Sequence, residues 1–561
     1  NGEFDATSGF ITFSDDGHLN LSSTVTSLGT LSEDIGTVTY AGTDQAIFSD
    51  TYNHLVIGGS SGTKTLAGDI SVNSDLTLNA DVTLDVSSSN NYSISVGGDW
   101  TDNGTFSAQE GTVTFNGTAD QVLTHGSSSF YNLTLNNTGV DNNLTIAADI
   151  DIDNDLTLTD GTLDLSTGNP LVTIGGDLTI SSGAVWTPGG DVTFDGTSQL
   201  LSDNNITPNN LGDGLISSGI LTVATNSEFI SFRINLGGKA IIDEGVTITL
   251  NGGHLTIDGE LEMADGSVVD VTEGATVAAT GILDMDGISN LMMEGNLTLD
   301  GTLEAGPDSR IILDGNSSHT ITGTSTPTFN SLFITSNPVV FDLTATINDT
   351  LDAGGQDVSI ATDKTLTLAD GSVTVISGGT WTRDGTLDID PDSKILYTTS
   401  DQTVLTNITH GNLEHDGGIL ILVDTLTVLG TFTNTSGNFA ASEDITASGI
   451  VWTAGSVTGA PSQAWDIGTD GITIDGGTFK ATTGTFTVAG DWTITGGTFT
   501  HNTSNIDFDG TTAQTITSNA NPFHSVAVSN TAATVSIADK FEFDAVGTLT
   551  IDASATFATA G

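Results

Sequence analysis

One repeated phrase constrains the fold more than any other feature of the sequence. Residues 98–139 read GDWTDNGTFSAQEGTVTFNGTADQVLTHGSSSFYNLTLNNTG, and shorter versions of the central part recur along the chain. In GTVTFNGT, Val113 and Phe115 alternate with threonines, which is the period of two of a β-strand with one buried face. The Asn-Gly pair that follows is typical of a tight bend. The sequence is therefore that of a repeat protein built from short strands.

The copies of this phrase share the same order of parts. Each strand closes on a bulky residue, and a glutamine, or once a histidine, follows five or six residues later. The bulky residues are Tyr40, Phe115, Phe194, Leu313, Tyr397 and Phe508. The polar residues are Gln45, Gln121, Gln199, His319, Gln402 and Gln514. We expect the bulky residues, Phe115 and Phe508 above all, to be buried.

The spacing of the copies distinguishes between two kinds of repeat protein. Measured at the first inward residue of each copy, from Val38 to Ile506, the intervals are 75, 79, 119, 84 and 111 residues. Separate β-sandwich domains would repeat at a nearly constant length, because each needs its full set of strands. A solenoid accepts additional coils without a break in the stack. The sequence thus predicts an all-β fold, a parallel β-helix (β-solenoid) of many short-strand coils that forms an elongated rod.

The repeats also predict how the chain is divided. Length alone would suggest about three or four domains, but we expect one continuous β-solenoid over residues 36–561. Within it, residues 200–233 are expected to be irregular and residues 246–313 to form tighter coils. Residues 1–35 hold the pattern loosely and are predicted to be an N-terminal cap or assembly segment, because terminal coils expose unpaired strands.

The charge of the chain excludes two classes of partner. There are 70 acidic residues, 57 of them Asp, against 9 basic ones, which gives a formal net charge of −61. Without a basic patch to neutralise phosphates, the sequence excludes nucleic acid as a partner, and the same argument excludes an anionic membrane surface. No apolar run approaches the length of a membrane span, so we expect no membrane insertion.

Two runs of aspartates are the candidate metal ligands. The first run is Asp149, Asp151, Asp153 and Asp155, and the second is Asp388, Asp390 and Asp392. In a strand each run would lie on the outer face, and calcium prefers such oxygen ligands. Neither run has the glycine and terminal glutamate of an EF-hand loop, so a solvated acidic face without metal is the alternative. Calcium is the one cofactor that the sequence suggests.

Catalytic motifs are weak. The segment GGSSG, which begins at Gly58, matches the nucleophile-elbow pattern but has no helix-forming segment after it and no placed histidine. The nine histidines lack the H-x-H and H-E-x-x-H spacings of zinc sites. We therefore expect a protein without enzymatic activity. The alternative is a polysaccharide-binding or polysaccharide-hydrolysing β-helix protein, because a glycoside hydrolase needs only two carboxylates.

Tryptophans recur at a fixed offset from the repeated phrase. Trp100, Trp381 and Trp492 precede the bulky closing residue of the next copy by 15, 16 and 16 residues. A constant offset favours aromatic stacking in the core, coil on coil. A sugar-binding aromatic platform is the alternative.

Residues 98–139 resemble a repeat of very large secreted and surface-displayed microbial proteins, GxWTxNGTF…GTVTFNGT…Q…FYNLTLNN. These proteins include adhesin-like and filament-forming β-solenoids. The resemblance is strong over residues 36–200 and 480–530 and weak over residues 200–300. It implies a β-solenoid at the cell surface or outside the cell, and it brings no catalytic motif.

These observations predict a secreted structural protein. We expect a subunit of a surface filament or stalk-like adhesin that assembles with itself head to tail, with surface glycans as alternative ligands. The strand-like segments FITFSDDGHLNL and VGTLTIDASATFATAG have the pattern needed to pair between copies. Because the chain begins without Met and stops within the strand pattern, we also expect a processed chain or an ordered fragment of a longer one.

Overall fold

The computed structural model confirms the predicted fold class. It describes residues 3–32, 35–139, 142–398, 401–458 and 462–559. Within these ranges every regular element is a β-strand, and no helix is present that could cross a membrane. The strands form a parallel β-solenoid with about 26 turns, called coils below.

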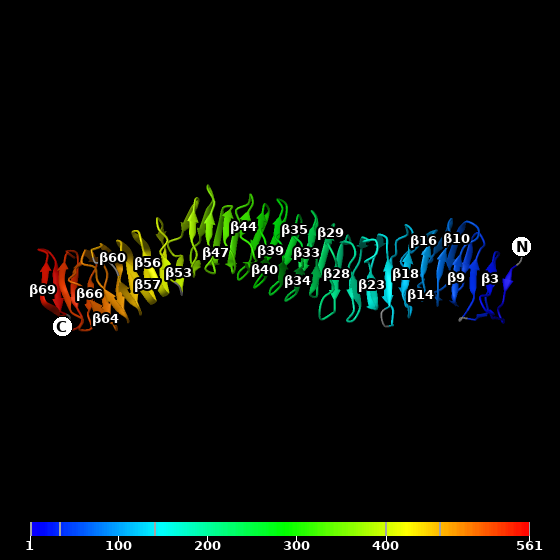
Figure 1. Ribbon diagram of the computed structural model, residues 1–561, viewed down its shortest axis with the longest axis horizontal. Helices are drawn as coiled ribbons and strands as arrows, with labels where there is room; N and C mark the ends of the chain where they lie inside the picture. The colour runs from blue at the N-terminus through cyan, green and yellow to red at the C-terminus, as the bar shows by residue number, and fades with distance from the viewer. Residues whose placement is uncertain (1–2, 33–34, 140–141, 399–400, 459–461, 560–561) are drawn as a thin grey trace. The chain divides into compact units, whose positions relative to one another are not determined.

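The chain divides into two compact units. Unit 1 comprises Asn1–Met292 with Asp300–Gly306, and unit 2 comprises Met293–Leu299 with Pro307–Gly561. Within each unit, strands of successive coils lie side by side (Figure 1).

One coil of unit 1 shows how the sequence builds the stack. Strands β11 (Ile70–Val72), β12 (Leu76–Leu78) and β13 (Val82–Asp85) follow one another around the coil, separated by short corners. Each pairs in parallel with a strand of the next coil, β11 with β14 (Ile94–Val96) and β12 with β15 (Trp100–Asp102). These strands of three or four residues suffice because β11, β12 and β13 each pair with a strand of the coil before and a strand of the coil after.

Inward side chains form continuous rows along the stack. In the 13-stranded sheet of unit 1, one such row joins consecutive partners: Val72, Val96, Phe115, Leu135 and Leu158. All five side chains are at most 1% exposed, and the serines and threonines between them face outward. The six bulky closing residues of the repeated phrase are likewise at most 1% exposed, which confirms the expectation for Phe115 and Phe508.

The recurring glutamine joins one coil to the next. Gln121, at the start of β18 (Gln121–Thr124), is fully buried. Its Oε1 accepts the N–H of Gly117, and its Nε2 donates to the carbonyls of Val96 and Gly98 in the preceding coil. The same three bonds are made by Gln45, Gln199 and Gln514. One side chain thus satisfies three backbone groups at a corner, where the strand ladder is interrupted.

Aspartates make a second type of link between coils. Oδ1 of Asp75 accepts the N–H of Asp99, and Oδ1 of Asp99 accepts the N–H of Val122 one coil further on. The same chain of contacts joins Asp155, Asp177 and Leu200. A side-chain oxygen can replace a backbone acceptor at a corner, so much of the Asp content has a structural use.

Some strands of unit 2 are longer than the sequence predicts. The longest are β56 (Asn412–Leu422), β57 (Leu426–Ala441) and β60 (Trp465–Ile474). In β57 the pairing register shifts between Val428 and Thr431, where the chain passes a corner. A bulge bends a strand without ending it, so the extended backbone continues from one face of the coil to the next.

Three segments carried separate expectations. In residues 1–35, strand β3 (His18–Leu21) pairs in parallel with β6 (Thr37–Tyr40) of the next coil. Residues 200–233 include β30 (Gly219–Val223), which pairs in parallel on both sides like its neighbours. The roles assigned to these segments, and the tighter coils of residues 246–313, stay predictions.

Candidate metal centre

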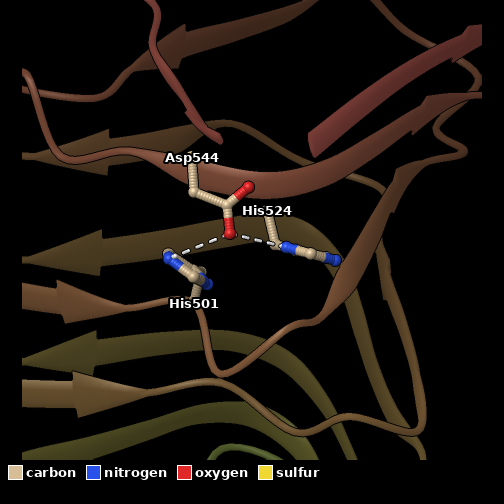
Figure 2. Close-up of side chains that lie close together, drawn as sticks. All are labelled: His501, His524 and Asp544. Atoms are coloured by element: carbon tan, nitrogen blue, oxygen red, sulfur yellow. Dashed lines mark hydrogen bonds and ion pairs between the residues drawn. The ribbon is translucent and has the colours of Figure 1, made fainter. Parts of the chain in front are cut away.

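Three potential ligands meet on the outer surface of unit 2. His501 follows β64 (Thr498–Thr500), His524 lies in β67 (Phe523–Val528), and Asp544 lies in β69 (Phe543–Ile551). They come from three successive coils, 23 and 20 residues apart. One ligand atom from each residue lies within 4.8 Å of the other two, and Figure 2 shows the carboxylate between the two imidazoles.

Strand alternation and a buried aromatic layer place these side chains. Phe523, which precedes His524, is fully buried, and its ring centroid lies 5.2 Å from that of Phe541. Successive residues of a strand point to opposite faces, so His524 faces outward. Gly547 allows β69 to approach closely, because a Cβ there would lie 2.0 Å from the carbonyl oxygen of His524.

The carboxylate of Asp544 is held in a defined orientation. Its Oδ2 lies 2.7 Å from Nδ1 of His524 and 3.7 Å from Nε2 of His501. Its Oδ1 accepts the backbone N–H of Val546 at 3.1 Å. The two imidazole rings stack at an interplanar angle of 22°. The backbone therefore fixes one carboxylate oxygen and leaves the other facing both rings.

The hydrogen bonds also define the protonation of the cluster. The hydrogen bond from His524 lowers the pKa of the Asp544 carboxyl below its usual value, so this group is ionised at neutral pH. Nδ1 of His501 accepts the backbone N–H of Thr503 at 3.3 Å, which puts the proton of the neutral ring on Nε2, on the side of Asp544. Nδ1 of His524 and Nε2 of His501 thus face the same carboxylate oxygen, at 2.7 Å and 3.7 Å.

The first predicted aspartate run is divided by a corner. Asp151 lies in β21 (Ile150–Ile152), with Asp149 and Asp153 exposed on either side. The chain bends after Ile152, and Asp155 lies at the corner, where its Oδ1 accepts the N–H of Asp177. Among the described residues, none of the four belongs to a group of three or more possible ligands within 4.8 Å.

Like charges face one another at this run. Partial desolvation raises the pKa of the exposed Asp151 carboxyl, and the neighbouring carboxylates of Asp153 and Asp195 raise it further. Burial and Asp153 also raise the pKa of Asp195, which follows β27 (Val192–Phe194). The acidic surface is therefore one that a cation or a proton would stabilise.

In the second predicted run, the structure brings two residues together and adds a third. Asp390 and Asp392 lie within 4.8 Å of Asp370 by their carboxylate oxygens, and Asp390 Oδ1 accepts the N–H of Asp392. Asp370 lies one coil earlier, after β49 (Thr365–Leu368). Asp388 lies in β52 (Thr386–Ile389) with its side chain exposed, outside this group.

The ligands that sequence reasoning missed recur at the spacing of one coil, which short motifs do not cover. Asp370 and Asp390 are 20 residues apart, and so are His524 and Asp544. In a solenoid, residues one coil apart in the sequence are neighbours in space. Short motifs such as H-x-H test neighbours within one strand, and they overlook ligands on successive coils.

Two of the three tryptophans belong to the core. Trp100 and Trp492 are fully buried, with ring contacts to Phe106 at 5.0 Å and Phe499 at 4.9 Å. Core packing is thus confirmed for both. Trp381 is only half-buried and lines a groove together with Arg383.

The nucleophile-elbow match lies in a different structural context from that of a hydrolase. The segment that begins at Gly58 connects β9 (His54–Ile57) to β10 (Gly62–Leu66). The motif requires a strand followed by a helix, whereas here a strand follows.

In comparisons with known proteins, no family model, no curated protein and no solved structure matches this chain.

Proposed function

We propose that the chain is an extracellular structural protein, a subunit of a surface filament or stalk-like adhesin whose copies stack end to end. The observation that carries this proposal is an uncovered row of apolar side chains in β69, which pairs with β67. Leu549 and Ile551 continue the inward row of Val526 and Val528, their direct partners. The two valines are fully buried, whereas Leu549 is 40% and Ile551 45% exposed.

A strand of the same pattern would cover this row. Each coil of the solenoid covers the inward residues of the coil before it, so a strand of another copy could cover this row with the geometry of an interior contact. Val546, 73% exposed, extends the apolar surface of β69. Exposed apolar edge strands favour pairing with another chain.

Unit 1 offers a complementary surface. Strand β2 (Phe10–Ile11) pairs with β5 (Thr30–Leu31), and Phe10 is 83% exposed. Contact between β69 of one copy and this segment of another is heterologous and does not close on itself, so it generates a fibre. The net charge of −61 would meanwhile repel copies that meet side by side, which favours axial growth.

The extracellular location rests on the repeated phrase. Residues 98–139 resemble the repeats of large secreted and surface-displayed microbial proteins, including adhesin-like β-solenoids. An acidic chain of this kind would also stay off anionic cell surfaces except where it is anchored. The proposed role is mechanical and adhesive, without enzymatic activity.

Glycan binding is a second candidate function, favoured by one observation. Trp381 is half-buried beside Arg383 in a groove of unit 2, whereas the other two tryptophans of the repeated phrase are buried. A partly exposed indole offers an apolar face to a sugar ring. A glycan array probed with the full chain and with Trp381→Ala tests this candidate, and equal signals would reject it.

Two matched variants of β69 test the stacking proposal. Ile551→Asp puts a charge into the uncovered row, and Thr550→Asp puts the same charge on the neighbouring outward residue, whose partner is Ala527. We expect fibres in negative-stain images of the parent chain and of Thr550→Asp, and single particles for Ile551→Asp. Fibres of Ile551→Asp as abundant as those of the parent would show that this edge is not the contact.

A further inference from the structure

We propose that His501, His524 and Asp544 bind a divalent transition-metal ion such as Zn²⁺, and that the ion clamps three successive coils of unit 2. This site lies on the outer surface of unit 2 and shares β69 with the proposed stacking contact, but none of its three ligands belongs to the inward row of Leu549 and Ile551. Its ligands are two imidazoles and one carboxylate, a set that leaves a coordination position for water or another ligand.

The distances within the cluster suit a common ion. Zinc binds imidazole nitrogen and carboxylate oxygen at about 2.0–2.2 Å, so two ligand atoms on a tetrahedral ion are about 3.4 Å apart. The observed separations from Asp544 Oδ2 are 2.7 Å to His524 Nδ1 and 3.7 Å to His501 Nε2. These values lie on either side of that distance, and small side-chain rotations bring both to it.

The ligand chemistry selects the class of metal. Imidazole suits Zn²⁺ and its neighbours in the transition series, whereas Ca²⁺ and Mg²⁺ prefer oxygen ligands. The many carboxylates elsewhere on the chain compete for the hard cations, and the other three-ligand group among the described residues contains no imidazole. Millimolar Mg²⁺ would therefore screen the acidic surface and leave this site available.

Binding requires a rearrangement of protons that the surroundings allow. The ion needs the lone pairs of His501 Nε2 and His524 Nδ1, so the proton of each neutral ring moves to its other nitrogen. The second ring nitrogen of His524 points away from the cluster (Figure 2), which leaves it free to carry a proton. In His501 the contact from Thr503 N–H to Nδ1, 3.3 Å long, is lost.

A backbone N–H already holds the carboxylate in place. The N–H of Val546 binds Oδ1 of Asp544 and directs Oδ2 towards the two rings. Partners of this kind orient a ligand and reduce the cost of ordering it when metal binds.

The bound ion would serve as a cross-link. The chain has no cysteine and therefore no disulfide to join its coils. In a solenoid each coil contacts only its neighbours, so a bond that spans three coils resists the local opening of the middle one. Metal that binds only the folded site adds its binding free energy to the stability of these coils.

Calorimetric titration of the full chain with Zn²⁺ in millimolar Mg²⁺ tests the site. We expect one Zn²⁺ per chain, with affinity reduced at least about tenfold in His524→Ala and in Asp544→Asn. Asp544→Asn preserves the size of the side chain, so it separates lost ligation from lost folding. The control is His254→Ala, since His254 binds Thr276 Oγ1 and belongs to no described three-ligand group.

Hydrogen exchange provides the structural readout. Zn²⁺ should slow exchange in residues 498–551 of the parent chain and of His254→Ala, while residues 36–139 stay unchanged. Equal zinc affinity in the parent chain and both ligand variants would place the ion elsewhere and overturn the proposal. Failure of the parent chain to bind Zn²⁺ would also overturn it, and the three residues would then form a hydrogen-bonded cluster only.

Discussion

The side-chain oxygen of Gln121 lies 3.2 Å from the backbone nitrogen of Gly117, within a corner closed to solvent. The amide nitrogen of the same side chain donates to the carbonyl of Val96 in the preceding coil at 3.0 Å. A Cβ on Gly117 would lie 2.6 Å from the carbonyl oxygen of Gly97. The close approach of two coils thus uses both residues, and four copies of the repeated phrase pair a glycine N–H with a glutamine side chain in this way.

The first prediction concerns this glutamine. Gln121→Leu keeps a side chain of similar size but removes the amide group. The Gly117 N–H and the carbonyls of Val96 and Gly98 then lose their hydrogen-bond partner. An unpaired buried polar group costs about 1–3 kcal/mol, so hydrogen exchange should accelerate in the coils on either side. Thr124→Val, on the exposed face of the same strand, is the control and should leave exchange unchanged. Equal exchange in the two variants would contradict the role of the glutamine.

The second prediction concerns the core. Phe115 is fully buried and its direct partners are Val96 and Leu135. Phe115→Ala should destabilise these coils by about 3–5 kcal/mol. Because stability in a solenoid is local to neighbouring coils, hydrogen exchange should increase around residue 115 and stay unchanged over residues 480–530. A uniform increase along the chain would contradict the nearest-neighbour account.

The third prediction concerns pH. His410 is fully buried, and burial lowers its pKa from 6.5 to about 4. Above pH 6.5 both the folded and the unfolded chain carry a neutral ring there, and below it the unfolded chain binds a proton that the folded chain rejects. Stability should therefore decrease as the pH falls through this window, by about 3 kcal/mol in total.

The difference between the parent chain and His410→Leu isolates this contribution, because the acidic residues are common to both. As the pH decreases from 7 towards 4, we expect the melting temperature of the parent chain to fall relative to that of His410→Leu. A difference that does not depend on pH would show that the folded chain protonates this ring as readily as the unfolded one.

The fourth prediction concerns calcium at the first aspartate run. The carboxylates of Asp153 and Asp195 raise the pKa of Asp151, and that of Asp153 raises the pKa of Asp195, so a bound cation would relieve their repulsion. We expect a chelator to lower the melting temperature of the parent chain, Ca²⁺ but not Mg²⁺ to restore it, and Asp151→Asn to be insensitive to both. Equal restoration by the two ions would leave only a screened acidic face.

The fold could be predicted because its determinants are local. Alternation around Val113 and Phe115 sets the strand, and the unequal intervals between copies exclude separate sandwiches. The long strands of unit 2 could not be predicted, since whether a corner ends a strand or bends it depends on register between coils. In β57 that register shifts between Val428 and Thr431 without ending the strand.

The candidate metal site could not be predicted from the sequence for a related reason. His501, His524 and Asp544 are distant in the sequence, and their contact depends on the length of the coils between them. Those lengths differ, 23 residues in one case and 20 in the other, so the alignment of coils has to be known before the ligands can be matched. For the aspartates the sequence pattern was visible but ambiguous. The carboxylate of Asp155 accepts the backbone N–H of Asp177 at a corner, and an aspartate in this role has the same sequence pattern as a metal ligand.

The central claim is head-to-tail stacking, and a mixture of two edge variants tests it most directly. Phe10→Asp places a charge in the contact surface of unit 1 and leaves β69 unchanged. Ile551→Asp places a charge in the apolar row of β69 and leaves the surface around Phe10 unchanged. Each variant alone should sediment as a monomer. An equimolar mixture retains one working pair of surfaces, so sedimentation velocity should show a dimer and no larger species. Monomers alone in the mixture, or fibres from either variant alone, would contradict the account.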